Sequence, residues 1–144
     1  MQKNFLFIVL ILLVSSLSFS SCNKDDEETK TDLLASRWEG ETVTTNATLN
    51  GVAFPVDVQD LSGSFIEFKS NGTYTSDDNG TFDGSGTWKF SNGEKDVIFD
   101  EGTDDETTFT ITSLSSSDLK LSYSEEETED GLTISVTVLI DLKK

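Results

Sequence analysis

Apolar and polar residues alternate along much of this chain, which leaves few folds open to it. The pattern is longest over residues 132–142, where Leu139 is the only apolar residue out of step. Successive side chains of a strand point to opposite faces, so this alternation predicts a strand with one buried face. The apolar positions of that face are Leu132, Ile134, Val136, Val138, Ile140 and Leu142. No helical period follows Trp38.

Turn residues separate the alternating segments. Asn-Gly between such segments signals a hairpin, because both residues tolerate the positive φ of a type I′ turn. Serines at 115–117 and the acidic stretch 125–130 predict two further turns. The four Asn-Gly pairs are Asn50-Gly51, Asn71-Gly72, Asn79-Gly80 and Asn92-Gly93.

These signals together predict an all-β fold. An antiparallel up-and-down meander of this length closes into an eight- or nine-stranded barrel, because closure removes exposed edges. The second expected strand contains Pro55, which cannot donate to a sheet ladder and prefers an edge. A helical turn over 31–36 precedes the strands, with Thr31 or Asp32 as its N-cap. The expected strands are 37–49, 51–59, 63–70, 73–77, 85–91, 95–100, 106–113, 117–125 and 131–142.

The first residues have the features of an export signal. Lys3 precedes an apolar run over 5–14, which is shorter than the roughly 20 residues of a membrane-spanning helix. Small and polar residues follow up to Cys22, as at a signal cleavage site. We therefore expect a signal peptide over 1–21, an acidic disordered tether over 22–30 and a folded domain over 31–144.

Cys22 is the single cysteine of the chain, so no intramolecular disulfide is available. The segment 19–22, Phe-Ser-Ser-Cys, resembles the lipobox of bacterial lipoproteins, which implies lipidation of Cys22. The following Lys24-Asp25-Asp26 resembles the acidic signal of surface lipoproteins in Gram-negative bacteria; a solvated spacer is the alternative. We expect a cell-envelope protein anchored to the outer membrane through its lipid, with its exposure at the surface left open.

The charge and the residue types exclude several functions. There are 27 acidic against 10 basic residues, a net charge of −17, which disfavours binding to nucleic acid and to anionic head groups. Histidine is absent, so neither a Ser-His-Asp triad nor a histidine metal site can form. Acidic turns such as 100–105 lack the spacing of a calcium loop. We expect a monomer that is no enzyme and has no metal or cofactor.

Beyond these patterns, the chain resembles the lipocalin-like domains of bacterial lipoproteins. The resemblance rests on Leu-Leu-Ala-Ser-Arg-Trp at 33–38, on Phe-Ile-Glu-Phe at 65–68 with Ser-Asn-Gly-Thr-Tyr at 70–74, and on Gly-Thr-Trp-Lys-Phe at 86–90. It implies a lipocalin-like barrel in which Trp38 plugs the closed end. It also implies a small hydrophobic ligand inside the barrel.

Aromatic residues are the candidate ligand-binding residues. They are expected to point into the barrel, where they either line a gap for an apolar molecule or pack into a filled core. Two hypotheses therefore remain: a carrier of a small hydrophobic molecule, or an interaction or accessory protein that acts through its acidic outer surface. The candidates are Phe68, Tyr74, Trp88, Phe90, Phe109 and Tyr123.

Overall fold

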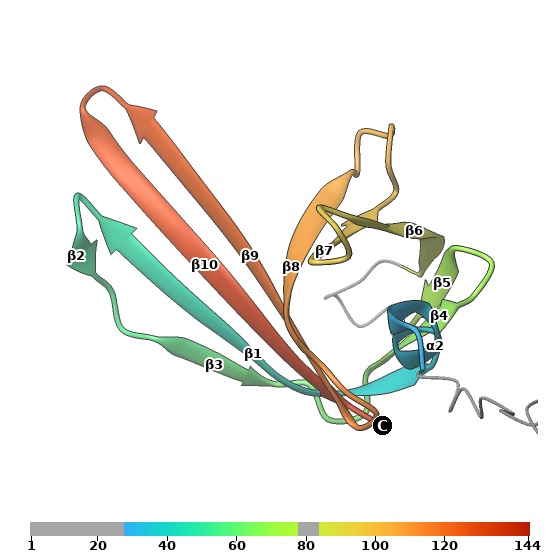
Figure 1. Cartoon of the computed structure of the whole chain (residues 1–144). Coiled ribbons are helices and arrows are strands. Elements are labelled where there is room, and N and C mark those ends of the chain that lie inside the picture. The colour runs from blue at the N-terminus through green and yellow to red at the C-terminus, as the bar shows by residue number, and fades with distance from the viewer. Residues whose placement is uncertain (1–27, 78–83) are drawn as a thin grey trace, which may run out of the picture.

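The computed structural model describes residues 28–77 and 84–144 and shows a closed antiparallel eight-stranded barrel with two additional strands (Figure 1). The expected all-β fold, an antiparallel meander closed into a barrel, is thus confirmed. A short helix, α2 (Lys30–Leu34), precedes the strands. The strands are β1 (Arg37–Leu49), β2 (Val52–Ala53), β3 (Asp57–Asp60), β4 (Phe65–Lys69), β5 (Thr73–Ser76), β6 (Ser85–Ser91), β7 (Asp96–Phe99), β8 (Thr107–Leu114), β9 (Asp118–Glu129) and β10 (Leu132–Lys143).

Strand β1 closes the barrel by pairing on both of its edges. One edge pairs with β10 along almost its whole length, from Glu39 to Leu49. The other edge pairs first with β4, then with β3 and finally with β2. The strands from β4 to β10 each pair with the next in sequence, so the meander is complete.

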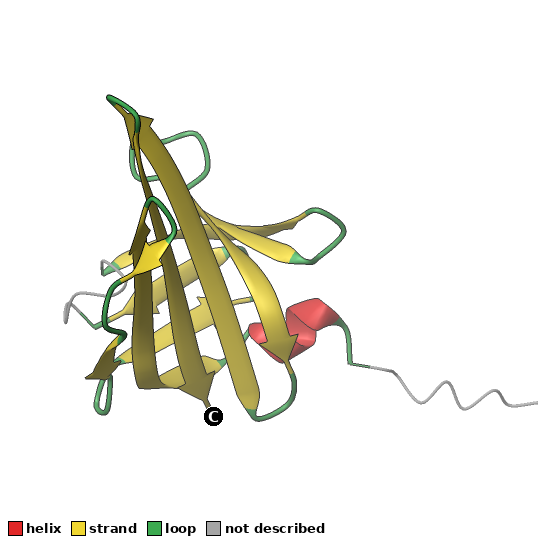
Figure 2. Cartoon of the chain, turned by 90° about the vertical axis from the view of Figure 1, so that its left-hand side faces the viewer, coloured by secondary structure: helices red, strands yellow, loops and turns green. Residues whose placement is uncertain are grey.

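The three longest strands extend past the closed part of the barrel. Of the residues of β1, only Arg37–Glu39 pair with β4. Of the residues of β9, only those up to Ser122 pair with β8. Beyond these points β1, β9 and β10, with β2 and β3, form a sheet that diverges from β4–β8 (Figure 1). In Figure 2 the long strands lie side by side along one wall. We call this sheet the wing, residues 43–60 and 123–139.

Turn chemistry explains most of the strand boundaries. Both residues of Asn50-Gly51 have positive φ, as the type I′ turn between β1 and β2 requires, whereas Asn92-Gly93 begins a longer loop in which Glu94 also has positive φ. The turn predicted over 125–130 is wrong, because β9 continues through its glutamates to Glu129. The chain reverses at Asp130-Gly131, again with positive φ at both residues. The pair Asn79-Gly80 lies outside the described residues.

Pro55 divides the strand that was expected over 51–59. The structure has β2 and β3 on either side of it, and both pair with β1. Proline has no N–H for a ladder, so a continuous strand would leave β1 without a donor at that point. One predicted strand therefore becomes the two short strands of the wing's edge.

The helix begins earlier than expected. Its N-cap is Thr29, whose hydroxyl accepts a hydrogen bond from the Asp32 N–H at 3.1 Å, while the Asp32 carboxylate accepts from the Thr29 N–H. The prediction of Thr31 or Asp32 as the cap is therefore wrong. Thr29 and Lys30, assigned to the tether, belong to this helix. The hydrogen bonds from Thr29 also lower the pKa of Asp32.

The hydrophobic core fills the closed part of the barrel. Trp38 is fully buried, and its indole Nε1–H donates to the Leu34 carbonyl at 3.0 Å, which ties β1 to α2. Lys144 places its ammonium group 4.7 Å from the Trp38 ring centroid. The buried apolar residues are Leu34, Trp38, Leu61, Ile66, Phe68, Tyr74, Trp88, Val97, Phe99, Leu119, Leu121, Ile140 and Leu142.

Gly40 is required where the segment between β3 and β4 packs closely against the edge of β1. A Cβ at this position would lie 2.6 Å from Leu61 Cβ and 2.7 Å from the Leu61 carbonyl oxygen. The Gly40 N–H also donates to the Ser64 carbonyl at 2.9 Å, so the two segments cannot separate freely. We expect Gly40→Ala to lower the free energy of unfolding by about 1–3 kcal/mol in urea denaturation.

A control for this prediction is Thr44→Ala, a change on the same strand away from the contact between Gly40 and Leu61. It should cost less than about 1 kcal/mol, the usual span of strand preferences. Equal losses in the two variants would show that the contact with Leu61 is not tight.

Candidate functional site

The barrel interior is occupied by a row of packed aromatic rings. Phe99 lies in the middle of the row, with its ring centroid 5.8 Å from Phe68, 5.1 Å from Tyr74 and 5.6 Å from Phe109. Trp88 packs edge-on against Phe68 at 5.7 Å. Such edge-to-face contacts at 5–6 Å are those of a packed core.

Phe90 and Tyr123 lie at the two ends of this row. Phe90 packs edge-on against Trp88 at 5.4 Å, and Tyr123 lies 5.8 Å from Phe109. Phe90, Phe109 and Tyr123 are only partly buried, whereas Phe68, Tyr74 and Trp88 belong to the buried core. The six candidate residues therefore belong to one row that Phe99 joins together, with Tyr123 of β9 as its end at the wing.

Asp100 binds the barrel wall. Its carboxylate accepts a hydrogen bond from the Tyr74 hydroxyl at 2.8 Å and from the Thr87 N–H at 2.7 Å. Its neighbour Glu101 forms an ion pair with Lys89. In the described part of the chain, no three His, Cys, Asp or Glu side chains are grouped as metal ligands.

The inner face of β10 leads from the core out to solvent. Leu142 is 3% exposed and Ile140 1%, whereas Ile134 is 50% and Leu132 52% exposed. Val138 and Val136, which lie between them on the same face, are half-buried. This gradual exposure is the geometry of an apolar surface that begins in a core and ends in an open mouth.

Neighbouring strands continue this inner face on both sides of β10. Directly opposite residues of antiparallel strands share a face. Ile134 lies opposite Leu49 of β1, and Leu49 lies opposite Val52 of β2. On the other side Ile134 lies opposite Glu127 of β9, so the apolar surface is bounded by carboxylates there.

A pocket of about 270 Å³ lies at the tip of this surface. Its lining combines two aliphatic side chains with three carboxyl groups. Leu132 and Ile134 are exposed apolar residues, an unusual choice for a solvated strand. The lining residues are Glu127, Glu129, Asp130, Leu132 and Ile134.

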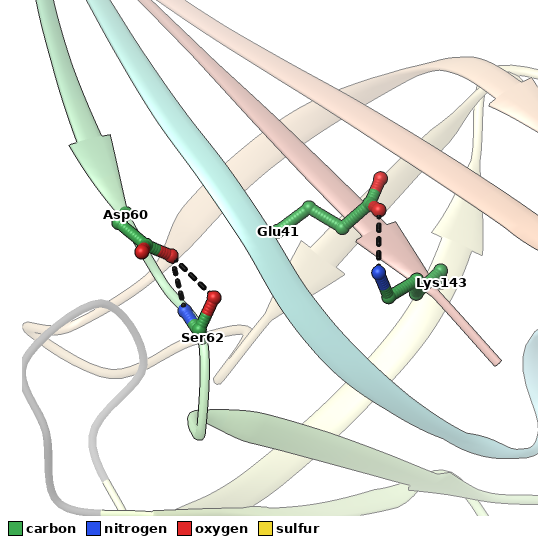
Figure 3. A network of polar contacts seen from close by, with 4 residues as sticks. All are labelled: Glu41, Asp60, Ser62 and Lys143. Atoms are coloured by element: carbon green, nitrogen blue, oxygen red, sulfur yellow. Dashed lines mark hydrogen bonds and ion pairs between the residues drawn. The ribbon is translucent and has the colours of Figure 1, made fainter.

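Polar contacts hold the wing where it leaves the barrel (Figure 3). The β1–β10 register shifts between Gly40 and Thr42, and Glu41 at this bulge accepts a hydrogen bond from Lys143 Nζ at 2.8 Å. This contact raises the pKa of Lys143. Nearby, the Asp60 carboxylate accepts from the Ser62 N–H at 2.8 Å and from its hydroxyl, which lowers the pKa of Asp60.

Tyr123 stands at the border between the aromatic row and the acidic part of β9. Its hydroxyl donates to Glu125 Oε2 at 2.8 Å. This hydrogen bond to a carboxylate is the main cause of the raised pKa of Tyr123. The single O–H of this phenol at the mouth of the barrel is thus held by Glu125.

A comparison with protein families identifies this architecture. The model of the lipocalin-like domain matches residues 34–121, more than half of the chain. This chain belongs to the lipocalin-like domain family. The resemblance to lipocalin-like domains is therefore confirmed, and a lipocalin-like barrel is a fold that can bind small molecules. Neither a curated protein nor a solved structure matches the chain.

Two features of the lipocalin-like domain were not predicted from the sequence. Phe99 was not among the candidate aromatic residues, although its alternation with Val97 could have identified it. The exposed wing residues Val52 and Leu132 were not recognised as a surface either. Their alternation is that of a buried face, and only the tertiary structure shows that the barrel leaves it open.

Cys22 and the segment before it lie outside the residues that the structure describes. Within the described ranges, no helix has the length and apolar character needed to cross a membrane.

Proposed function

We propose that this lipocalin-like protein is a lipid-anchored lipoprotein of the bacterial cell envelope that binds a small hydrophobic molecule at the mouth of its barrel. Family members are generally binding proteins rather than enzymes, which supports a function without catalysis. The lipobox-like segment ending at Cys22 supports the anchor, and Lys24-Asp25-Asp26 supports the outer membrane and an outward orientation.

The observation that carries the ligand proposal is the exposed inner face of β10. Ile134 and Leu132 are about half exposed on a face that is continuous with the core. Burying such side chains against an apolar ligand contributes about 25 cal/mol for each Å² removed from water. The packed rings of Phe68, Trp88 and Phe99 leave the mouth, rather than the centre, for this ligand.

A fluorescent probe binding assay tests this proposal. The unlipidated chain from residue 22 onward is titrated with N-phenyl-1-naphthylamine, a neutral apolar dye that the acidic surface does not repel. We expect saturable binding that Ile134→Ser weakens about tenfold, because the side chain would otherwise be buried by the ligand.

The matched control is Leu139→Ser. Leu139 is 37% exposed and lies on β10 like Ile134, but an odd number of residues away and hence on the outer face. The control should bind the dye as the parent chain does. Equal weakening in both variants, or no binding to the parent chain, would contradict a ligand site at the mouth.

The packed aromatic row favours a second candidate function. A filled barrel suits an interaction or accessory protein of the envelope that acts through its acidic surface. Native mass spectrometry with a bacterial lipid extract separates the two. A stoichiometric lipid adduct supports the carrier, whereas a folded chain without adducts supports the interaction protein.

A further inference from the structure

Strand β9 has a free edge along the wing. Its pairing with β8 ends at Ser122, opposite Thr110. From Tyr123 to Glu129 the strand continues to pair with β10 on its other side, and no described strand pairs with it on the side of β8. A free edge offers unpaired N–H and C=O groups to an additional strand.

The side chains along this edge have a regular charge pattern. Glu125, Glu127 and Glu129 lie opposite the apolar inner-face residues of β10 and share their face. The alternate residues face outward, and all three hydrogen-bond across to β10: the Ser124 hydroxyl with Thr137 at 3.0 Å, Glu126 with Ser135 at 2.8 Å and the Thr128 hydroxyl with Thr133 at 2.9 Å. The inner side of the edge therefore carries three negative charges at strand spacing.

We propose that the free edge of β9 binds an extended basic segment of a partner protein, with Lys or Arg at every second position. The backbone of the added strand forms hydrogen bonds with the unpaired N–H and C=O groups of β9. Its basic side chains lie beside the three glutamates, where opposite charges on neighbouring strands attract.

Charge complementarity selects this occupant over a second copy of the chain. Two β9 edges placed together would bring the glutamates of both copies to neighbouring strands, and like charges there repel. The net charge of −17 adds repulsion at longer range. The same charge attracts a basic segment, and it disfavours an anionic membrane surface.

Peptide binding tests the proposal. The probe is fluorescein-labelled Thr-Lys-Thr-Lys-Thr-Lys-Thr, and its anisotropy is measured with the full mature chain without lipid. We expect the triple variant Glu125→Gln, Glu127→Gln, Glu129→Gln to bind at least about tenfold more weakly. A control variant with the same change of charge carries Glu94→Gln, Asp104→Asn and Asp105→Asn, which lie outside the wing. It should retain binding to within about threefold.

A second peptide tests the backbone pairing without changing the protein. The same sequence with every internal backbone amide methylated keeps its charges but has no N–H to donate to β9, so it should not bind. Equal binding of the methylated peptide, or equal weakening in the control variant, would overturn the proposal in favour of unspecific attraction. A dimer of the chain alone in sedimentation would overturn it as well, since a second copy would then cover the wing.

Discussion

Trp38→Ala is expected to lower the free energy of unfolding by about 3–5 kcal/mol, the cost typical of removing a large buried aromatic side chain. Trp38 is fully buried and belongs to the same core cluster as Ile66 and Leu142. The change also removes the hydrogen bond to the Leu34 carbonyl and the contact with the Lys144 ammonium group. Urea denaturation, followed by circular dichroism, measures the loss.

The matched variant for this prediction is Trp38→Phe. Phenylalanine retains an apolar ring but cannot donate to Leu34, so its loss should be clearly smaller than that of alanine. A loss below about 1 kcal/mol for Trp38→Ala would show that this end of the barrel does not depend on Trp38.

Cys22→Ala is expected to move the protein completely from the membrane fraction to the soluble fraction. Stable anchoring needs two or more acyl chains, and the proposed site for them is the single thiol of the chain. Labelled palmitate incorporation and cell fractionation measure the outcome. Because the chain has no other cysteine, loss of a disulfide within the chain cannot explain a change in this variant.

The control for the anchor is Ser20→Ala, which keeps a small residue within the segment 19–22. It should remain lipidated and membrane-bound. Labelled fatty acid on the Cys22→Ala variant would contradict the lipoprotein proposal.

Local sequence predicted the strands well wherever turn chemistry and alternation agreed. The expected ranges 37–49 and 85–91 coincide with β1 and β6. The acidic stretch after Tyr123 was wrongly predicted as a turn, because consecutive glutamates usually indicate a solvated loop. They form a strand here because β10 supplies a pairing partner for each of them, while the exposed wing keeps their carboxylates in water.

The candidate site was only partly predictable. Alternation selected the aromatic residues that face inward, but it did not reveal whether they line a gap or touch one another. The ring centroids of Phe68, Trp88 and Phe99 are separated by 5–6 Å, which shows that these rings pack against one another. Nor did the sequence reveal that Ile134 is half exposed while Ile140, on the same face of the same strand, is buried.

What the sequence alone determined was the all-β class, the order of the strands and the face of each strand that turns inward, because these depend on residues close together in the chain. Only the tertiary structure decided where the barrel ends and the wing begins. That boundary depends on contacts between distant segments, such as the close approach of Leu61 to Gly40 and the end of the β8–β9 ladder at Ser122. Because such contacts join residues far apart in the sequence, no local pattern contains them.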